Sequence, residues 1–114
     1  MAFPSYVKPL VMLSLDSATL AGSYLPITGA GGLLNSLFLL KIVNNSTVDV
    51  IISYDGTNPH DYIPTKTAVL FDLQSNASPN NLRAWLAQGT HVYVNGATGV
   101  GDIFLTGWYQ PSVV

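Results

Sequence analysis

Five segments between residues 37 and 109 place apolar side chains at every second position. The segments are LFLLKIV (37–43), VDVIISY (48–54), TAVLFDL (67–73), THVYVN (90–95) and DIFLTGWY (102–109). Successive side chains of a β-strand point to opposite faces, so this period predicts strands that are covered on one face.

The segments between these strands have the composition of turns. NNST (44–47), DGTNPHD (55–61), SNASPNN (75–81) and NGATGVG (95–101) are rich in Gly, Pro, Asn, Asp and Ser. All six acidic residues are Asp and none is Glu, which favours turns and caps over long helices. The chain is therefore predicted to be mainly β: a single domain over residues 1–114, folded as an antiparallel sandwich of jelly-roll type with about seven or eight strands.

The first third of the chain has a weaker pattern. Residues 1–35 are predicted to be an extended or arm-like N-terminal segment with one or two strands. Two segments also fit short helices. Residues 31–42 repeat apolar side chains at helical spacing, and residues 81–89 begin at a capping Asn81 and end before Gly89.

Composition excludes several classes of function. The chain has no cysteine, which excludes disulfides, thiolate catalysis and Cys-based zinc sites. A net charge of −2 and four scattered cations give no basic surface, so we expect no nucleic-acid partner. The most apolar window, residues 33–43, is interrupted by polar residues and too short to span a bilayer, so we expect no membrane partner.

The low charge content predicts assembly. Only 9% of residues are charged, against about a quarter in ordinary soluble domains, while 48% are hydrophobic. One face of each strand can fill the core, so apolar side chains on the other face are expected to meet a partner. The candidate interface residues are Leu37, Leu39, Val43, Phe104 and Trp108. We expect a homo-oligomer.

The stretch VDVIISYDGTNPHDYIP (48–64) gathers Asp49, Asp55, His60 and Asp61. Asp-Gly after an alternating strand is a strong hairpin signal, because Gly56 adopts a positive φ at low cost. A metal site would use Asp55, His60 and Asp61, but their spacing matches neither an EF-hand loop nor a zinc-protease helix. We interpret the cluster as turn chemistry. No GxSxG motif or phosphate-binding loop is present, and we predict no catalytic, cofactor-binding or metal-binding residues.

Two stretches, KIVNNSTVDVIISYDGTNPHDYIPTKTAVLFDLQSN (41–76) and GTHVYVNGATGVGDIFLTGWY (89–109), resemble small virion structural proteins of tailed bacteriophages. The resemblance covers roughly residues 41–109. It implies a non-enzymatic β-sandwich protein that is present in many copies in the head, neck or tail of a virion and contacts other copies and other virion proteins. It implies no catalytic residues and no cofactor.

An alternative function is left open by the aromatic side chains. Exposed Tyr and Trp residues also serve as stacking platforms for sugars, so the chain could instead be a carbohydrate-binding module or a receptor-contacting β-sandwich. The residues for such a platform are Tyr54, Tyr62, Trp85, Tyr93, Trp108 and Tyr109.

Overall fold

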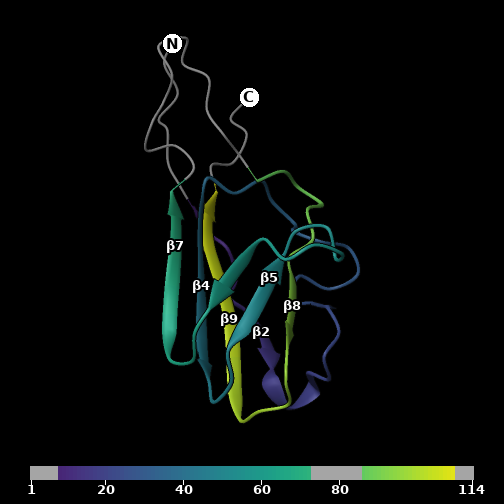
Figure 1. Ribbon diagram of the computed structural model, residues 1–114. Helices are drawn as coiled ribbons and strands as arrows, with labels where there is room; N and C mark the ends of the chain where they lie inside the picture. Colours follow the sequence, from purple (N-terminus) through teal and green to yellow (C-terminus); the bar gives the residue numbers. More distant parts are fainter. Residues whose placement is uncertain (1–7, 73–85, 110–114) are drawn as a thin grey trace, which may run out of the picture.

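The computed structural model describes residues 8–72 and 86–109, and its architecture is mainly β as predicted (Figure 1). The described strands are β1 (Lys8–Pro9), β2 (Leu13–Asp16), β3 (Leu25–Pro26), β4 (Leu39–Ser46), β5 (Val50–Ser53), β6 (Asp61–Ile63), β7 (Thr67–Asp72), β8 (Tyr93–Gly96) and β9 (Gly101–Tyr109). One 3-10 turn, η1 (Ser17–Thr19), is capped by the Asp16 carboxylate, which accepts the backbone N–H of Ala18.

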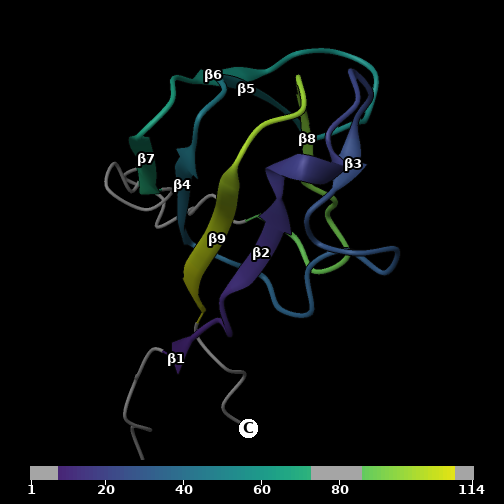
Figure 2. The same cartoon turned by 90° about the horizontal axis from the view of Figure 1, so that it is seen from below.

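The strands form two antiparallel sheets that lie face to face (Figure 2). In the five-stranded sheet β9 pairs with both β1 and β2 on one side and with β4 on the other, and β4 then pairs with β7. The four-stranded sheet has the order β3-β8-β5-β6. Covering one face of each sheet with the other is what the alternating segments require.

The strand pairing is that of a jelly roll. From β2 to β9 the pairs are nested: β2 with β9, β3 with β8, β4 with β7 and β5 with β6. The chain therefore runs as one long hairpin that is wrapped so that β4 also meets β9 and β5 also meets β8. This arrangement is an eight-stranded jelly roll, with β1 as a short addition at one edge.

The core lies between the inner faces of the two sheets. Its fully buried side chains are aliphatic and come from every part of the described chain: Leu20, Leu33, Leu37, Leu40, Ile42, Val50, Ile52, Ile63, Val92, Val94, Ile103 and Leu105. The alternation correctly predicted the inward side of β4 and β9, where Leu40 and Ile42 pack with Ile103 and Leu105.

The end of β4 carries a buried polar cluster that the sequence pattern did not predict. NNST was predicted to be a turn, but β4 continues through Ser46, and both Asn44 and Ser46 are fully buried. The Asn44 amide donates to the carbonyls of Val48 (2.8 Å) and Ile63 (3.0 Å), and its oxygen accepts from the Ser46 hydroxyl (2.6 Å). Because buried amides must be paired, this cluster fixes β4 of one sheet against β6 of the other.

Several predictions about the first third and about helices are wrong. The strands expected in the first third are present as β2 and β3, but residues 8–35 are not an arm, because β1, β2 and β3 each pair within a sheet; residues 1–7 lie outside the described residues. Residues 31–42 form no helix; residues 39–42 belong to β4, and residues 31–38 lead into it. Of the second predicted helix, residues 86–89 are not helical and residues 81–85 lie outside the described part.

Candidate interface on the five-stranded sheet

The outer face of the five-stranded sheet carries most of the predicted interface residues. Along β4, Leu39 and Val43 alternate with the buried Leu40 and Ile42, so they point away from the core. The same alternation places Phe104 and Trp108 on the outer side of β9. Leu39, Val43 and Phe104 are half-buried by their neighbours, and Trp108 is 40% exposed.

The strand register brings these four side chains together. Leu39 lies opposite Trp108, and Val43 lies opposite Phe104, so two apolar cross-strand pairs sit on the same face. The pair of Lys41 and Thr106 lies between them. Directly opposed side chains in an antiparallel pair are in contact range, so these residues form one surface.

Leu37 does not belong to this surface. It is 0% exposed and part of the core, and its backbone exchanges hydrogen bonds with Leu86 at 2.8 and 2.7 Å. The strict alternation begins only at Leu39, where β4 starts. Counting the period back to residue 37 therefore assigned Leu37 to the wrong face, and its place in the interface prediction is wrong.

Sequence reasoning missed the contribution of β7 to the same surface. Ala68 lies opposite Val43 and Leu70 lies opposite Lys41, and both are exposed; for Leu70 the exposed fraction is 62%. The signal was present in TAVLFDL, because Leu70 shares a face with the outward Asp72. We call Leu39, Val43, Leu70, Phe104 and Trp108 the outer apolar face.

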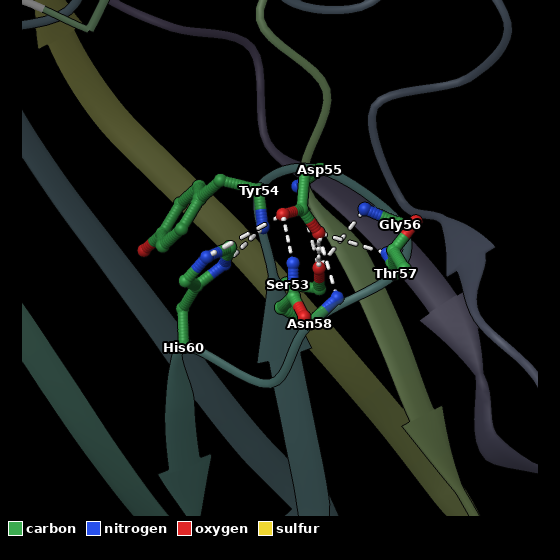
Figure 3. A network of polar contacts seen from close by, with 7 residues as sticks. All are labelled: Ser53, Tyr54, Asp55, Gly56, Thr57, Asn58 and His60. Atoms are coloured by element: carbon green, nitrogen blue, oxygen red, sulfur yellow. Dashed lines mark hydrogen bonds and ion pairs between the residues drawn. The ribbon is translucent and has the colours of Figure 1, made fainter.

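Of the residues that could have formed a metal site, Asp55 and His60 lie in the loop between β5 and β6 (Figure 3), and Asp61 is the first residue of β6. One oxygen of Asp55 accepts the backbone N–H groups of Thr57 and Asn58, both at 2.8 Å, and the Asn58 amide donates to the other oxygen at 2.9 Å. These bonds, led by the Asn58 backbone N–H, hold the pKa of Asp55 well below its usual range. Gly56 has a φ of 77°, which confirms the predicted hairpin residue.

His60 closes the same loop. Its Nδ1 atom accepts the backbone N–H of Tyr54 at 2.9 Å, and its Nε2 atom lies 3.7 Å from Asp55 Oδ2 (Figure 3). Burial, with a smaller contribution from Asp61, raises the pKa of the neighbouring Tyr54 to about 12. Asp61 points to its own strand and accepts the Tyr62 N–H at 2.9 Å. The polar atoms of the loop therefore hold the loop itself.

A second polar group lies on the outer face of the four-stranded sheet. The Tyr62 hydroxyl donates to Asp49 Oδ2 at 2.7 Å, and the Thr65 N–H donates to Oδ1 at 2.8 Å. Both bonds lower the pKa of Asp49, the Tyr62 bond more strongly, and the same bond raises the pKa of Tyr62. The predicted strand over residues 90–95 begins only at Tyr93, so His91 lies just before β8, where it stacks on Tyr93 with ring centroids 5.8 Å apart and its Nε2 atom lies 2.9 Å from the Ala30 carbonyl oxygen.

We also searched the described residues for metal-binding clusters, pockets and membrane-spanning helices. Within residues 8–72 and 86–109, no group of three or more His, Asp or Glu side chains is arranged to hold a metal ion. A pocket of about 490 Å³ between the β1–β2 edge and residues 28–35 is lined mainly by apolar groups, among them Leu10, Leu13 and Leu34. No helix in the described part of the chain has the length and apolar character needed to cross a bilayer.

Comparisons with protein-family models, with curated proteins and with solved structures found no match to this chain.

Proposed function

We propose that the chain is a non-enzymatic structural protein of a tailed-phage virion, present in multiple copies and joined to its neighbours through the outer apolar face. The observation that carries this proposal is the chemistry of that face. Leu39, Val43 and Phe104 point away from the core next to the exposed Trp108 and Leu70. Lys41 and Thr106 lie between these side chains, and the apolar groups on either side of them make the face a candidate interaction site.

Burial of such a face supplies enough free energy for assembly. Hiding about 300 Å² of apolar surface contributes about 7 kcal/mol before the cost of association. Each copy in a virion has several neighbours, and multivalent contacts strengthen weak individual ones. A small domain with few charges is suited to a position that is repeated many times.

The jelly-roll fold is compatible with a structural role in a virion, but it is equally compatible with other functions. Jelly rolls occur in viral capsid proteins and also in lectins, and a fold alone does not determine a function. The polar groups of the β5–β6 loop support a structural role, because Asp55 and His60 bond to backbone groups of their own loop. The resemblance of residues 41–109 to virion proteins supplies the particular setting.

Mass spectrometry of purified virions tests the proposal. Trypsin cleaves after Lys41 and Lys66 and releases residues 42–66 as one peptide. Density-purified particles of the phage that carries the coding sequence should contain this peptide in an amount that corresponds to many copies per particle. A peptide found in the infected-cell lysate but absent from purified particles would overturn the proposal.

A carbohydrate-binding function is the second candidate, and one observation favours it. Tyr62 is 54% exposed on the outer face of the four-stranded sheet, and its hydroxyl bonds Asp49. An exposed aromatic ring offers a flat apolar surface to a sugar ring, and a carboxylate beside it can accept hydrogen bonds from sugar hydroxyls. Glycan-array binding that is lost in Tyr62→Ala would support this candidate, and a blank array would remove it.

A further inference from the structure

Strand β7 (Thr67–Asp72) is the longest edge strand among the described residues. Within residues 8–72 and 86–109 it pairs only with β4, and it has six residues without proline. The other edges are shorter: β3 and β1 have two residues each and contain Pro26 and Pro9, β6 has three residues, and β2 has four and ends at Asp16. Proteins shield their edges by shortness, proline and charge, and β7 lacks the first two.

The direction of the backbone bonds in β7 follows from the sheet. The Leu10 N–H donates to the Gly107 carbonyl at 2.8 Å, so odd-numbered residues of β9 bond toward β1. By alternation, even-numbered residues of β9 bond toward β4, even-numbered residues of β4 bond toward β7, and odd-numbered residues of β7 bond back to β4. Ala68 and Leu70 therefore direct their backbone N–H and C=O groups outward, away from the sheet.

We propose that two copies of the chain pair through β7 as antiparallel strands around a two-fold axis at Val69, which makes the two five-stranded sheets continuous. This proposal rests on the self-association in the proposed function but uses the backbone edge of the sheet instead of its outer face. A two-fold interface needs a surface that is complementary to itself, and β7 provides one.

The register centred on Val69 satisfies both the backbone and the side chains. It places Ala68 of each copy opposite Leu70 of the other, so the outward backbone groups of both residues find partners. A small side chain then lies beside a large one on the outer face. Lys66 precedes the strand in a turn with a φ of 59° and donates to Asn45 Oδ1 at 3.2 Å, so the register rests on the backbone groups and the Ala68–Leu70 pairs alone.

The pairing also enlarges the outer apolar face. Leu70, at 62% exposed, is the most exposed of the five residues of that face and the one that lies on β7. Pairing across β7 brings the Leu70 side chains of two copies to the seam between the sheets. The outer apolar faces of two copies then form one surface, which offers a virion neighbour about twice the apolar area.

Cysteine cross-linking tests the register directly, because the chain has no cysteine of its own. At a non-hydrogen-bonded antiparallel pair the Cα atoms lie about 4.5 Å apart, within the range of a disulfide. Val69→Cys should therefore form covalent dimers under mild oxidation of dilute protein. Thr67→Cys is the matched control in the same strand, since its two copies lie about 13 Å apart in this register. Equal cross-linking of both variants, or none by Val69→Cys, would overturn the proposal.

A proline substitution tests the backbone contacts. Ala68→Pro removes an outward N–H that the β4 ladder does not use, so the chain should keep its circular dichroism spectrum. In the Val69→Cys background it should reduce cross-linking at least about tenfold, and Ala68→Ser should not. Leu70→Lys is a second edge-protecting variant, with the same expected loss, in case Ala68→Pro fails to fold.

The two assembly proposals fail separately. Trp108→Asp alters the outer apolar face but not β7, so it should leave Val69→Cys cross-linking unchanged. Association that is sensitive to Trp108→Asp, without any Val69→Cys cross-link, would overturn β7 pairing and leave outer-face assembly standing. Cross-linked Val69→Cys dimers together with Trp108→Asp association equal to that of the wild type would overturn outer-face assembly and support β7 pairing.

Discussion

The two sheets present different chemistry on the faces that point away from the core. On the five-stranded sheet, Leu39 lies against Trp108 and Val43 against Phe104. On the four-stranded sheet, the outward Tyr62 carries a hydroxyl that is bonded to Asp49 at 2.7 Å. Outward tyrosine and aspartate side chains of this kind are hydrated or bonded to each other, whereas outward leucine, valine and tryptophan are not.

The difference between the outward side chains of the two sheets shows what an alternating sequence does and does not predict. Period-two alternation shows that each strand has two faces, but the chemistry of the outward residues decides whether that face meets water or protein. The four-stranded sheet can end at solvent with its polar groups paired. The five-stranded sheet leaves apolar surface that a partner would cover. Each of the following substitutions tests this contrast.

The largest expected effect is on the free energy of unfolding, and it distinguishes a core residue from a residue of the outer apolar face. Leu37→Ala should lower the free energy of unfolding by about 2–5 kcal/mol, because it opens a cavity in the core. Leu39→Ala, two residues away on the outer face, should cost less than about 1 kcal/mol in folding but should weaken association. Urea denaturation of both variants measures the folding effects. Equal losses of stability would mean that Leu39 is a core residue as well.

The next effect concerns the loop at the end of the four-stranded sheet. Gly56→Val should destabilise the fold by about 1–2 kcal/mol, because a branched residue resists the left-handed conformation. Its Cβ would also lie 3.2 Å from the Tyr93 ring. Gly31→Ala is the control, since Gly31 has no positive φ and no atom within 4 Å of an added Cβ. A Gly56→Val protein that melts with the wild type would disprove the assignment of this turn.

The inner faces were predicted well, and the physical reason is local. Alternation alone places Leu40 with Ile42 on one face of β4 and Ile103 with Leu105 on one face of β9, because the direction of each side chain depends only on its own strand. The turn at Gly56 follows from local backbone preference in the same way. These features need no knowledge of which strands pair.

The failures involve contacts between distant parts of the chain. Leu37 points inward and pairs with Leu86, and the local sequence pattern does not predict this pairing. Residues 31–42 have helical spacing, but pairing with β7 and β9 makes residues 39–42 part of a strand. Asn44 has the local sequence context of a turn residue. In the structure it is buried, and its amide donates to the carbonyl of Ile63, nineteen positions away in the sequence. Tertiary contacts therefore overrode local propensity at each of these positions.

A smaller effect is expected in acid, at the Asp55 loop. The folded-state pKa of Asp55 lies below its unfolded value of about 3.9. The carboxylate therefore stabilises the fold above about pH 4, and this contribution is lost as the pH falls through the folded-state pKa. Asp55→Asn keeps an oxygen acceptor but cannot titrate, so its melting temperature should fall less between about pH 4 and pH 2. Parallel profiles for the two proteins would contradict this assignment.

The smallest effect tests the polar face of the four-stranded sheet. Tyr62→Phe removes the hydroxyl bonded to Asp49, so the pKa of Asp49 should rise toward its ordinary value, with little change in melting temperature. Carboxyl chemical shifts followed by NMR during an acid titration measure this pKa. An unchanged Asp49 titration would show that the Tyr62 bond does not persist in solution.

Sedimentation of matched variants of the two outer faces is the most direct test of the central claim that the outer apolar face joins the copies. The wild type should associate with rising concentration, and Trp108→Asp should raise the dissociation constant at least about tenfold, or about 1.4 kcal/mol, while remaining folded. Tyr62→Asp, the same change on the four-stranded sheet, should leave association unaltered. A wild type that stays monomeric at high concentration and does not bind virions, or a Tyr62→Asp variant that weakens association as much as Trp108→Asp does, would contradict the claim.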